Sequence, residues 1–99
     1  MPYHNRMCVR VIREELTLPN GDVYTGEWDA DANRMDGRGE LFSLLEESLY
    51  EGQFVDGYRS LHGRVIFKNG DVYVGGWMND EMCGMGEFRS HNGRTVYNG

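Results

Sequence analysis

The sequence contains few cysteines and no long apolar segment, and both shortages narrow the class of protein. Cys8 and Cys83 are its two cysteines in 99 residues, so we expect reduced thiols rather than a disulfide framework, with a bond between the two left open. No run of about 18 apolar residues occurs, and the first residues contain no apolar signal-peptide core, so neither a membrane span nor secretion is supported. We expect a cytoplasmic protein.

Basic residues are scarce relative to acidic ones. The 10 lysines and arginines stand against 16 aspartates and glutamates, which gives a formal net charge of −6. Such a charge repels phosphate backbones and anionic lipid headgroups, and the chain has no lysine or arginine cluster of the size that recruits proteins to acidic membranes. The sequence therefore argues against a nucleic-acid partner and supports membrane binding only weakly.

Side chains that carry catalysis or bind metals are present, but not at the spacings that such chemistry needs. The 3 histidines have no cysteine or carboxylate at zinc-ligand spacing, and the glycine-rich segments lack the phosphate-loop pattern. Carboxylates do lie in pairs, but none follows the calcium-loop spacing, and acidic loop residues are usually only solvated. We predict no catalytic residue, no metal site and no cofactor, and hence no enzyme. The acidic pairs are Glu14-Glu15, Glu46-Glu47 and Asp80-Glu81.

Glycine, by contrast, is abundant and recurs within a repeated pattern. The chain has 14 glycines, and the stretch Asn69–Trp77 (NGDVYVGGW) closely matches Asn20–Trp28 (NGDVYTGEW). A third copy, 49–54, keeps the Tyr-x-Gly-x-aromatic core, and a fourth, 92–99, stops at its glycine. Self-similarity at a period of this order indicates a repeat array rather than an ordinary globular core. The tyrosines that mark the copies are Tyr24, Tyr50, Tyr73 and Tyr97.

The repeated unit resembles the MORN (membrane occupation and recognition nexus) repeat, whose motif runs Tyr-x-Gly-x-Trp, a short loop, Gly-x-Gly, an aromatic and Asp/Asn-Gly. The resemblance covers residues 20–99, with units at 22–48, 49–71 and 72–95 and a partial unit at 96–99. The last full unit matches best, whereas the second has Leu61 where the family has the first glycine of its pair, and the first has a longer internal loop. We interpret 8–99 as one array preceded by a flexible segment, 1–7.

Alternation along each extended stretch predicts a stripe of aromatic side chains on one face of a sheet. Residues at i, i+2 and i+4 of a strand share a face, so the tyrosine, glycine and aromatic of each unit point one way, and Glu51 and Gln53 point the other way. We expect the large rings to lie over cross-strand glycines, because a missing Cβ lets a ring pack flat on the backbone. The glycines assigned to this structural role are Gly26, Gly37, Gly39, Gly52, Gly63, Gly75, Gly84 and Gly86.

Asn-Gly pairs at 20–21, 69–70 and 92–93 predict hairpins with type I′ turns that join one unit to the next. Chained hairpins give an all-β fold: a single-layer, twisted antiparallel meander of about three MORN units with partial caps. Residues 15–18 fit the second strand of a degenerate unit that caps the array, whereas 8–16 satisfies strand and helix spacings alike. The segment 43–49, which lacks Gly and Asn, is interpreted as an irregular turn.

The resemblance implies a non-catalytic protein-binding or scaffold module in the cytoplasm, at cytoskeletal or membrane-associated assemblies. A single sheet has no second layer, so a partly open aromatic groove would bind an apolar partner face, such as an amphipathic helix or a basic peptide. Met78, Met82 and Met85 would add an adaptable rim. The residues predicted to bind this partner are Tyr24, Trp28, Tyr50, Phe54, Tyr73, Trp77 and Phe88.

Two other functions stay open at this point. One is phospholipid or membrane-surface binding, which the family name suggests. The other is a targeting segment of a larger enzyme, similar to the arrays attached to some lipid kinases and lysine methyltransferases. Because the chain stops at 96–99, before the aromatic of a full unit, we also expect either a longer array or self-association. The simplest form would be a two-fold homodimer through the edge strand or the aromatic faces.

Overall fold

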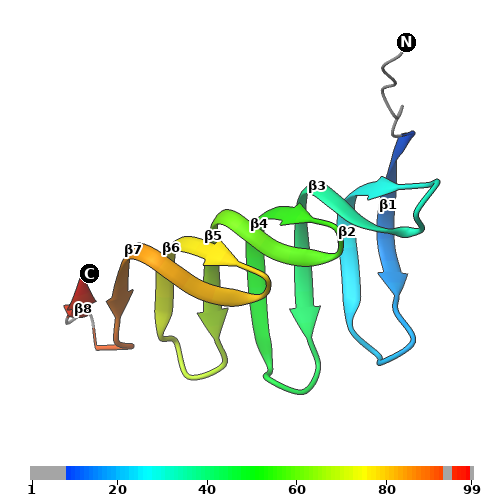
Figure 1. The fold of residues 1–99 in the computed structure, drawn as a ribbon. Coiled ribbons are helices and arrows are strands. Elements are labelled where there is room, and N and C mark those ends of the chain that lie inside the picture. Colours follow the sequence, from blue (N-terminus) through cyan, green and yellow to red (C-terminus); the bar gives the residue numbers. More distant parts are fainter. Residues whose placement is uncertain (1–8, 93–94, 99) are drawn as a thin grey trace, which may run out of the picture.

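The computed structural model describes residues 9–92 and 95–98, and all regular structure in them is β-strand. The strands follow one another in sequence order along one 8-stranded sheet (Figure 1). The described residues contain no helix, and so none that is long and apolar enough to cross a membrane. The strands are β1 (Arg10–Thr17), β2 (Val23–Asp29), β3 (Arg34–Ser43), β4 (Ser48–Val55), β5 (Tyr58–Phe67), β6 (Val72–Met78), β7 (Glu81–Arg89) and β8 (Thr95–Asn98).

Every strand pairs antiparallel with the next, which confirms the predicted all-β meander. The ambiguous segment 8–16 is a strand from Arg10 onward and pairs with β2. Leu16 lies opposite Tyr24, so the predicted cap strand is present, although it ends at Thr17. The expected flexible segment, 1–7, lies outside the described residues.

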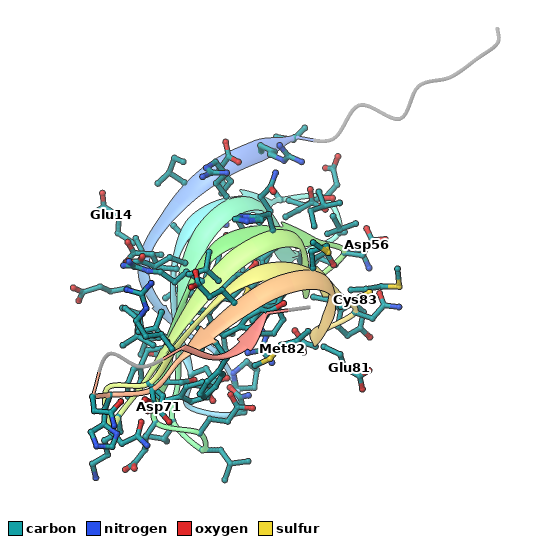
Figure 2. The ribbon with its side chains drawn as sticks, turned by 90° about the vertical axis from the view of Figure 1, so that its left-hand side faces the viewer. Glu14, Asp56, Asp71, Glu81, Met82 and Cys83 are labelled. Atoms are coloured by element: carbon teal, nitrogen blue, oxygen red, sulfur yellow. The ribbon has the colours of Figure 1, made fainter. Side chains whose placement is uncertain are left out.

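Each hairpin bends where two glycines pair. In β2–β3 the pairing is regular up to Gly26–Gly39 and resumes at Trp28–Met35, so three residues of β3 face one residue of β2. The same shift recurs in β4–β5 and β6–β7, whereas the pairings that join the hairpins, β3–β4 and β5–β6, run without a shift. Bulges bend strands, and in the view of Figure 2 the sheet is an arc with a concave and a convex side.

The predicted type I′ turns at Asn20-Gly21 and Asn69-Gly70 are wrong in type. Both glycines have positive φ, 96° and 95°, but neither asparagine does. The Gly21 N–H donates to the Leu18 carbonyl at 2.9 Å, and each asparagine side chain accepts the N–H of the residue two positions later. This is a type I turn followed by a left-handed glycine, as in three-residue hairpin loops. The Asn-Gly pair at 92–93 lies partly outside the described residues.

Two-residue turns with both residues in the left-handed region occur at the opposite edge of the sheet. Asp56-Gly57 joins β4 to β5, and Asn79-Asp80 joins β6 to β7, with φ values between 49° and 88°. These are the conformations of type I′ turns, which suit the twist of flanking strands. The segment 43–49 is confirmed as a turn, but a shorter one of four residues, 44–47, between β3 and β4.

The bulge of each hairpin includes one residue in the left-handed region, and in β5 that residue is not glycine. Gly37 and Gly84 have φ values of 106° and 74° at this position, and Leu61 has 68°. A leucine in this region suffers a clash between its Cβ and the backbone, at about 1–2 kcal/mol. Leu61 gains little packing in return, since 60% of its surface is exposed.

Leu61→Gly should therefore stabilise the fold, by about 0.5–1 kcal/mol, because the relief of strain exceeds the added chain entropy of glycine in the unfolded state. Urea unfolding followed by circular dichroism measures the change. Leu61→Ala is the matched control, since it removes the exposed side chain but keeps the Cβ. An equal gain from Leu61→Ala would show that the exposed apolar side chain, and not backbone strain, destabilises the fold at this position.

Candidate functional site

Six aromatic rings form a continuous chain along the concave side of the sheet. Each tyrosine packs on the aromatic residue four positions later in its own strand, and Tyr24 and Tyr50 also pack on the aromatic of a neighbouring hairpin. Ring centroids lie 5.1 Å to 5.9 Å apart, and four of the five contacts are edge-to-face, the arrangement that ring quadrupoles favour. In spatial order the rings are Trp28, Tyr24, Phe54, Tyr50, Trp77 and Tyr73.

These rings are the hydrophobic core. Their exposed fractions run from 0% for Tyr24 to 6% for Trp28. Val65 is equally buried among them and was missed by the sequence analysis, whereas Phe88 is only partly buried and packs against the cluster from β7. Since the arc of the sheet covers its own aromatic face, a single layer suffices to bury the core. The assignment of the seven aromatic residues to partner binding stays a prediction.

Each core tyrosine also satisfies a backbone carbonyl at the bend of its hairpin. The Tyr50 hydroxyl donates to the carbonyl of Gln53 at 2.8 Å, and Tyr73 donates to Gly76 at 3.1 Å. Tyr24 makes the same bond to Glu27. In each hairpin this carbonyl belongs to the one residue that faces three residues of the partner strand. A buried carbonyl without a partner costs about 1–3 kcal/mol, so the tyrosines make the bend possible.

A row of glycines crosses the sheet beneath the tyrosine rings. Its members pair with one another on six successive strands, β2 to β7. A Cβ on Gly86 would lie 2.5 Å from ring carbons of Tyr73 and closer still to its hydroxyl, and the same holds for Gly39 below Tyr24 and Gly63 below Tyr50. The predicted packing of ring on glycine is confirmed here. The row consists of Gly26, Gly39, Gly52, Gly63, Gly75 and Gly86.

Gly37 and Gly84 have a different role from the one predicted for them. A Cβ on Gly37 would meet the Glu27 side chain rather than a ring, and one on Gly84 would meet nothing within 4 Å. Both have the positive φ that the bulge requires. The Gly-x-Gly pattern therefore combines two demands: backbone conformation at the first glycine, and room for a ring at the second.

Burial changes the acidity of the core tyrosines. It raises the pKa of the Tyr50 hydroxyl to about 12, against smaller lowering effects from the Gln53 hydrogen bond and Arg59. Burial is also the main cause that raises the pKa of Tyr24, with the charges of Glu27 and Asp36 adding to it. Both hydroxyls are thus held in the protonated form that donates to the bend.

Arg59 spans the concave side between the two edges of the sheet. It lies opposite Phe54 in β4–β5, the place held by Met35 and Met82 in the other hairpins. Its guanidinium lies 4.7 Å from the centre of the Trp77 ring, contacts Asp80 at 3.1 Å and approaches Glu46, at the other edge, to 3.8 Å. A largely buried cation over an aromatic face adds both electrostatic and packing energy. No repeat signal in the sequence marks this residue.

We call the concave side the groove. It contains hollows on both sides of Arg59. The N-terminal hollow, of about 550 Å³, is lined by Leu16–Asn20 at one edge and by Trp28 and Asn33–Met35 at the other. Two C-terminal hollows, of about 310 and 330 Å³, meet at Met82. Met82 is 46% exposed, so it offers apolar surface that the core rings do not. Of the three methionines predicted to form a rim, it is the one that lines these hollows.

Carboxylates predominate in the turns along both edges of the groove, which face each other across the arc (Figure 2). Some of them also join neighbouring turns: Asp71 accepts the His91 N–H at 2.7 Å, and Asp22 accepts the Leu44 N–H at 3.0 Å. Desolvation raises the pKa of Asp71, but hydrogen bonds from His91 and Asn69 outweigh it and hold that pKa below its usual value. The turns from β1 to β7 contain seven carboxylates and one lysine: Asp22, Asp31, Glu46, Glu47, Asp56, Asp71 and Asp80, and Lys68.

The described residues form no visible site for metal binding or nucleophilic catalysis. Among the residues that the structure describes, no cluster of three His, Cys, Asp or Glu side chains is placed to hold a metal ion. Cys83 is a free, exposed thiol, and Cys8 lies outside the described residues.

Comparison with known proteins agrees with this geometry. The MORN repeat family model matches residues 50–72 and 73–93. MORN repeat-containing protein 3 of Xenopus laevis is 42% identical over 81 residues, which cover 76% of this chain and 33% of the relative. The chain belongs to the MORN repeat family. It spans about a third of the length of that relative.

The first MORN unit has the same geometry as the other two, although the family model matches only those two. Its tyrosine donates to the carbonyl at the bend, and its glycines pair as in the other hairpins. The difference lies in its internal turn, 30–33, which has four residues where the other units have two. The Asp29 carboxylate organises this longer turn by accepting the N–H groups of Asp31 and Ala32 at 2.9 and 3.0 Å.

Gly86→Ala should destabilise the MORN array by about 3 kcal/mol, because the new methyl group overlaps the Tyr73 ring and forces it off its position. Thermal or urea unfolding measures the loss. The matched background is Tyr73→Ala, in which the ring is absent and the added methyl group has room. If Gly86→Ala costs as much in that background as in the wild type, ring crowding is not its cause.

Alkaline pH should unfold the array through its core tyrosines. The folded pKa of Tyr50, about 12, lies above the value of about 10 in an unfolded chain. The stabilisation is thus fully present below about pH 10 and is lost as pH rises toward 12. The measurement is the urea midpoint at each pH, with tyrosinate absorbance followed in parallel. Tyr50→Phe should show a smaller loss over this range, and an unchanged pH profile would contradict the coupling.

Proposed function

We propose that this MORN array is a non-catalytic protein-binding module whose groove takes a basic amphipathic segment, most simply a helix. The observation that carries the proposal is the pairing of apolar hollows in the groove with carboxylates along both of its edges. A helix with its side chains measures about 10–12 Å across, and an apolar stripe of such a helix is the usual ligand of a hydrophobic groove.

Contact would be made by the exposed lining of the groove rather than by the buried rings. Met82 and the N-terminal hollow supply accessible apolar surface, and the rings below hold the floor rigid. Preorganisation of this kind lowers the cost of binding, because few side chains need to be ordered. Arg59 divides the floor, so we expect the partner's apolar residues to lie on either side of it.

The charge of the edges favours a basic partner. The carboxylates of the turns raise the local concentration of positively charged ligands and repel anionic ones. The same charges disfavour the rival hypothesis, an anionic membrane surface, which is recognised by clusters of lysine and arginine. Targeting of a larger enzyme by the array would use the same groove.

A designed helical peptide tests the proposal. The probe has about 18 residues, with leucine at i, i+3, i+4 and i+7 and lysine on the opposite face, and binding is read by fluorescence anisotropy. We expect Met82→Asp to weaken binding at least tenfold, about 1.4 kcal/mol, because it places a charge in the apolar lining. Met78→Asp is the matched control: Met78 is 59% exposed in the adjacent strand, and its change should leave affinity within about twofold, below the scale of a hot spot.

The charge contribution is tested separately. Glu81→Lys, at a C-terminal hollow, should weaken binding of the lysine-bearing peptide. Glu40→Lys, outside the groove lining, should leave that binding unchanged. A peptide with glutamate in place of lysine should bind more weakly, and phosphatidylserine vesicles should not sediment with the array. No binding of the basic peptide up to millimolar concentration, or equal losses from Met78→Asp and Met82→Asp, would refute the groove as the site.

A further inference from the structure

A row of apolar side chains crosses the convex side of the sheet, away from the aromatic core. Cross-strand pairing holds its members in register on five successive strands, β2 to β6. Each is next in sequence to a core residue, as Leu49 is to Tyr50, so alternation turns it to the outer face. None of the five packs against the core cluster. We call these five residues the outer row: Val23, Phe42, Leu49, Ile66 and Val72.

Phe42 of the outer row and two apolar residues beside the row are exposed, and the other four members are half-buried. Phe42 is 40% exposed, and Val74, one step along β6 from the row on the same face, is 36% exposed. Leu44, which follows Phe42 by two residues, is 57% exposed. Contiguous apolar surface of this kind on a charged protein marks a contact site more often than scattered exposed residues do.

The outer row has a large, partly exposed side chain near one end and a hollow at the other. Phe42, on β3, is the largest side chain of the row. Three strands away, a hollow of about 290 Å³ lies against Val72 and Val74 on β6, with charged side chains of β5 and β7 around it. A large side chain and a hollow that lie three strands apart on one face can meet only between two molecules.

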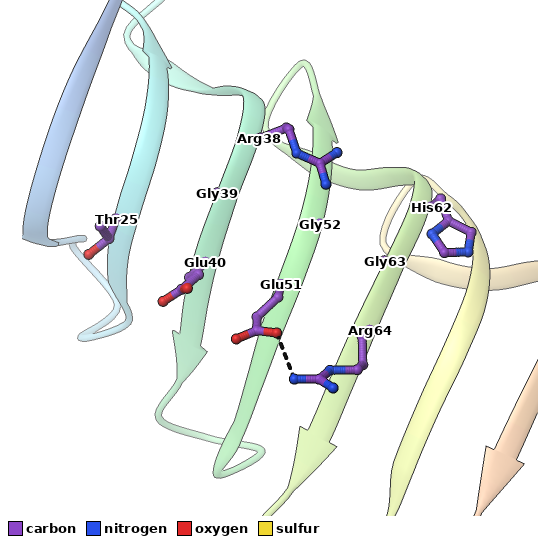
Figure 3. Close-up of a pocket in the computed structure, with 9 residues that line it drawn as sticks. All are labelled: Thr25, Arg38, Gly39, Glu40, Glu51, Gly52, His62, Gly63 and Arg64. Carbon is purple, nitrogen blue, oxygen red and sulfur yellow. Dashed lines mark hydrogen bonds and ion pairs between the residues drawn. The ribbon is translucent and has the colours of Figure 1, made fainter.

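Charges beside the outer row are largely separated by sign. Most acidic ones lie toward the N-terminal half of the sheet and most basic ones toward the C-terminal half, with Arg38 on β3 and Glu87 on β7 as the exceptions. Where the halves meet, Arg64 and Glu51 form an ion pair of 2.9 Å, and Lys68 and Glu47 one of 3.3 Å. Figure 3 shows Glu40, Glu51 and Arg64 side by side on this face. The acidic residues are Glu40, Glu47 and Glu51, and the basic ones Arg64, Lys68 and Arg89.

We infer that a second copy of the chain packs on the outer row, convex face to convex face, about a two-fold axis that runs along the strands between β4 and β5. Such an axis places β3 of one copy over β6 of the other, so Phe42 of each enters the hollow of its partner. It also sets Glu51 over Arg64 and Glu47 over Lys68 of the other copy. The contact is isologous, and each interaction occurs twice.

This arrangement replaces the two modes of self-association expected from the sequence with a third. The aromatic faces are closed by the curvature of the sheet, whereas the outer face offers apolar surface and complementary charge together. The dimer is independent of the proposed groove function. Both grooves face away from the contact, so each copy stays able to bind a partner, and the dimer would present two binding sites on opposite sides.

Sedimentation velocity on the full chain, from micromolar to millimolar concentration at about 0.15 M salt, tests the inference. At this ionic strength exposed charges are screened beyond about 8 Å, which limits the repulsion between two copies. We expect the wild-type mass to rise toward that of a dimer and Phe42→Glu to weaken association at least tenfold. Leu45→Glu is the matched control, since Leu45 is 93% exposed in a turn outside the row, and it should associate as the wild type does. If Phe42→Glu does not fold, Val74→Glu serves in its place.

A charge swap distinguishes this dimer from other contacts. Glu51→Arg and Arg64→Glu should each weaken association, because like charges then meet across the axis. The double variant should associate with itself again, but not with the wild type, since a mixed pair sets two arginines against each other at one contact and two glutamates at the other. A wild type that stays monomeric to millimolar concentration would overturn the inference. So would dimerisation by Phe42→Glu at wild-type strength, or free mixing of the double variant with the wild type.

Discussion

The contact of a tyrosine ring with a pair of glycines is the interaction on which the rest of this structure depends. Each ring lies on backbone that has no Cβ, and its hydroxyl donates to a carbonyl at the bend. Without the glycines the ring has no room, and without the hydroxyl the bend would bury an unsatisfied acceptor. Three repeats of this contact fix the curvature of the sheet.

Curvature solves a problem that a single layer cannot otherwise solve. A flat sheet with aromatic residues on one face needs a second layer to exclude water. Here the strands bend around the rings, so the sheet covers itself and buries the tyrosines and tryptophans of the core almost completely. Contacts between hairpins, such as Tyr24 with Phe54 and Tyr50 with Trp77, then couple each unit to its neighbour, as expected of a repeat protein.

The bend also gives the molecule two unlike surfaces. The concave one has a rigid floor, exposed apolar residues such as Met82, and acidic edges. The convex one presents the outer row with charges of both signs beside it. Because the glycine row separates the two halves of every hairpin, both surfaces repeat along the sheet with the period of the units. Binding of a partner on one side and of a second copy on the other would thus be compatible.

Local periodicity in the sequence was sufficient to predict the repeat, the antiparallel strands, the aromatic face and the contact of Tyr73 with Gly86, because these follow from alternation and from spacing within about 15 residues. The bend was not predictable in this way. It arises from register shifts between paired strands, which give Gly84 a conformational role instead of a packing one. Arg59 across the groove and the outer row depend on which strands become neighbours and on which side the sheet curves. Such features are decided by the tertiary structure, since they join residues that no local pattern relates.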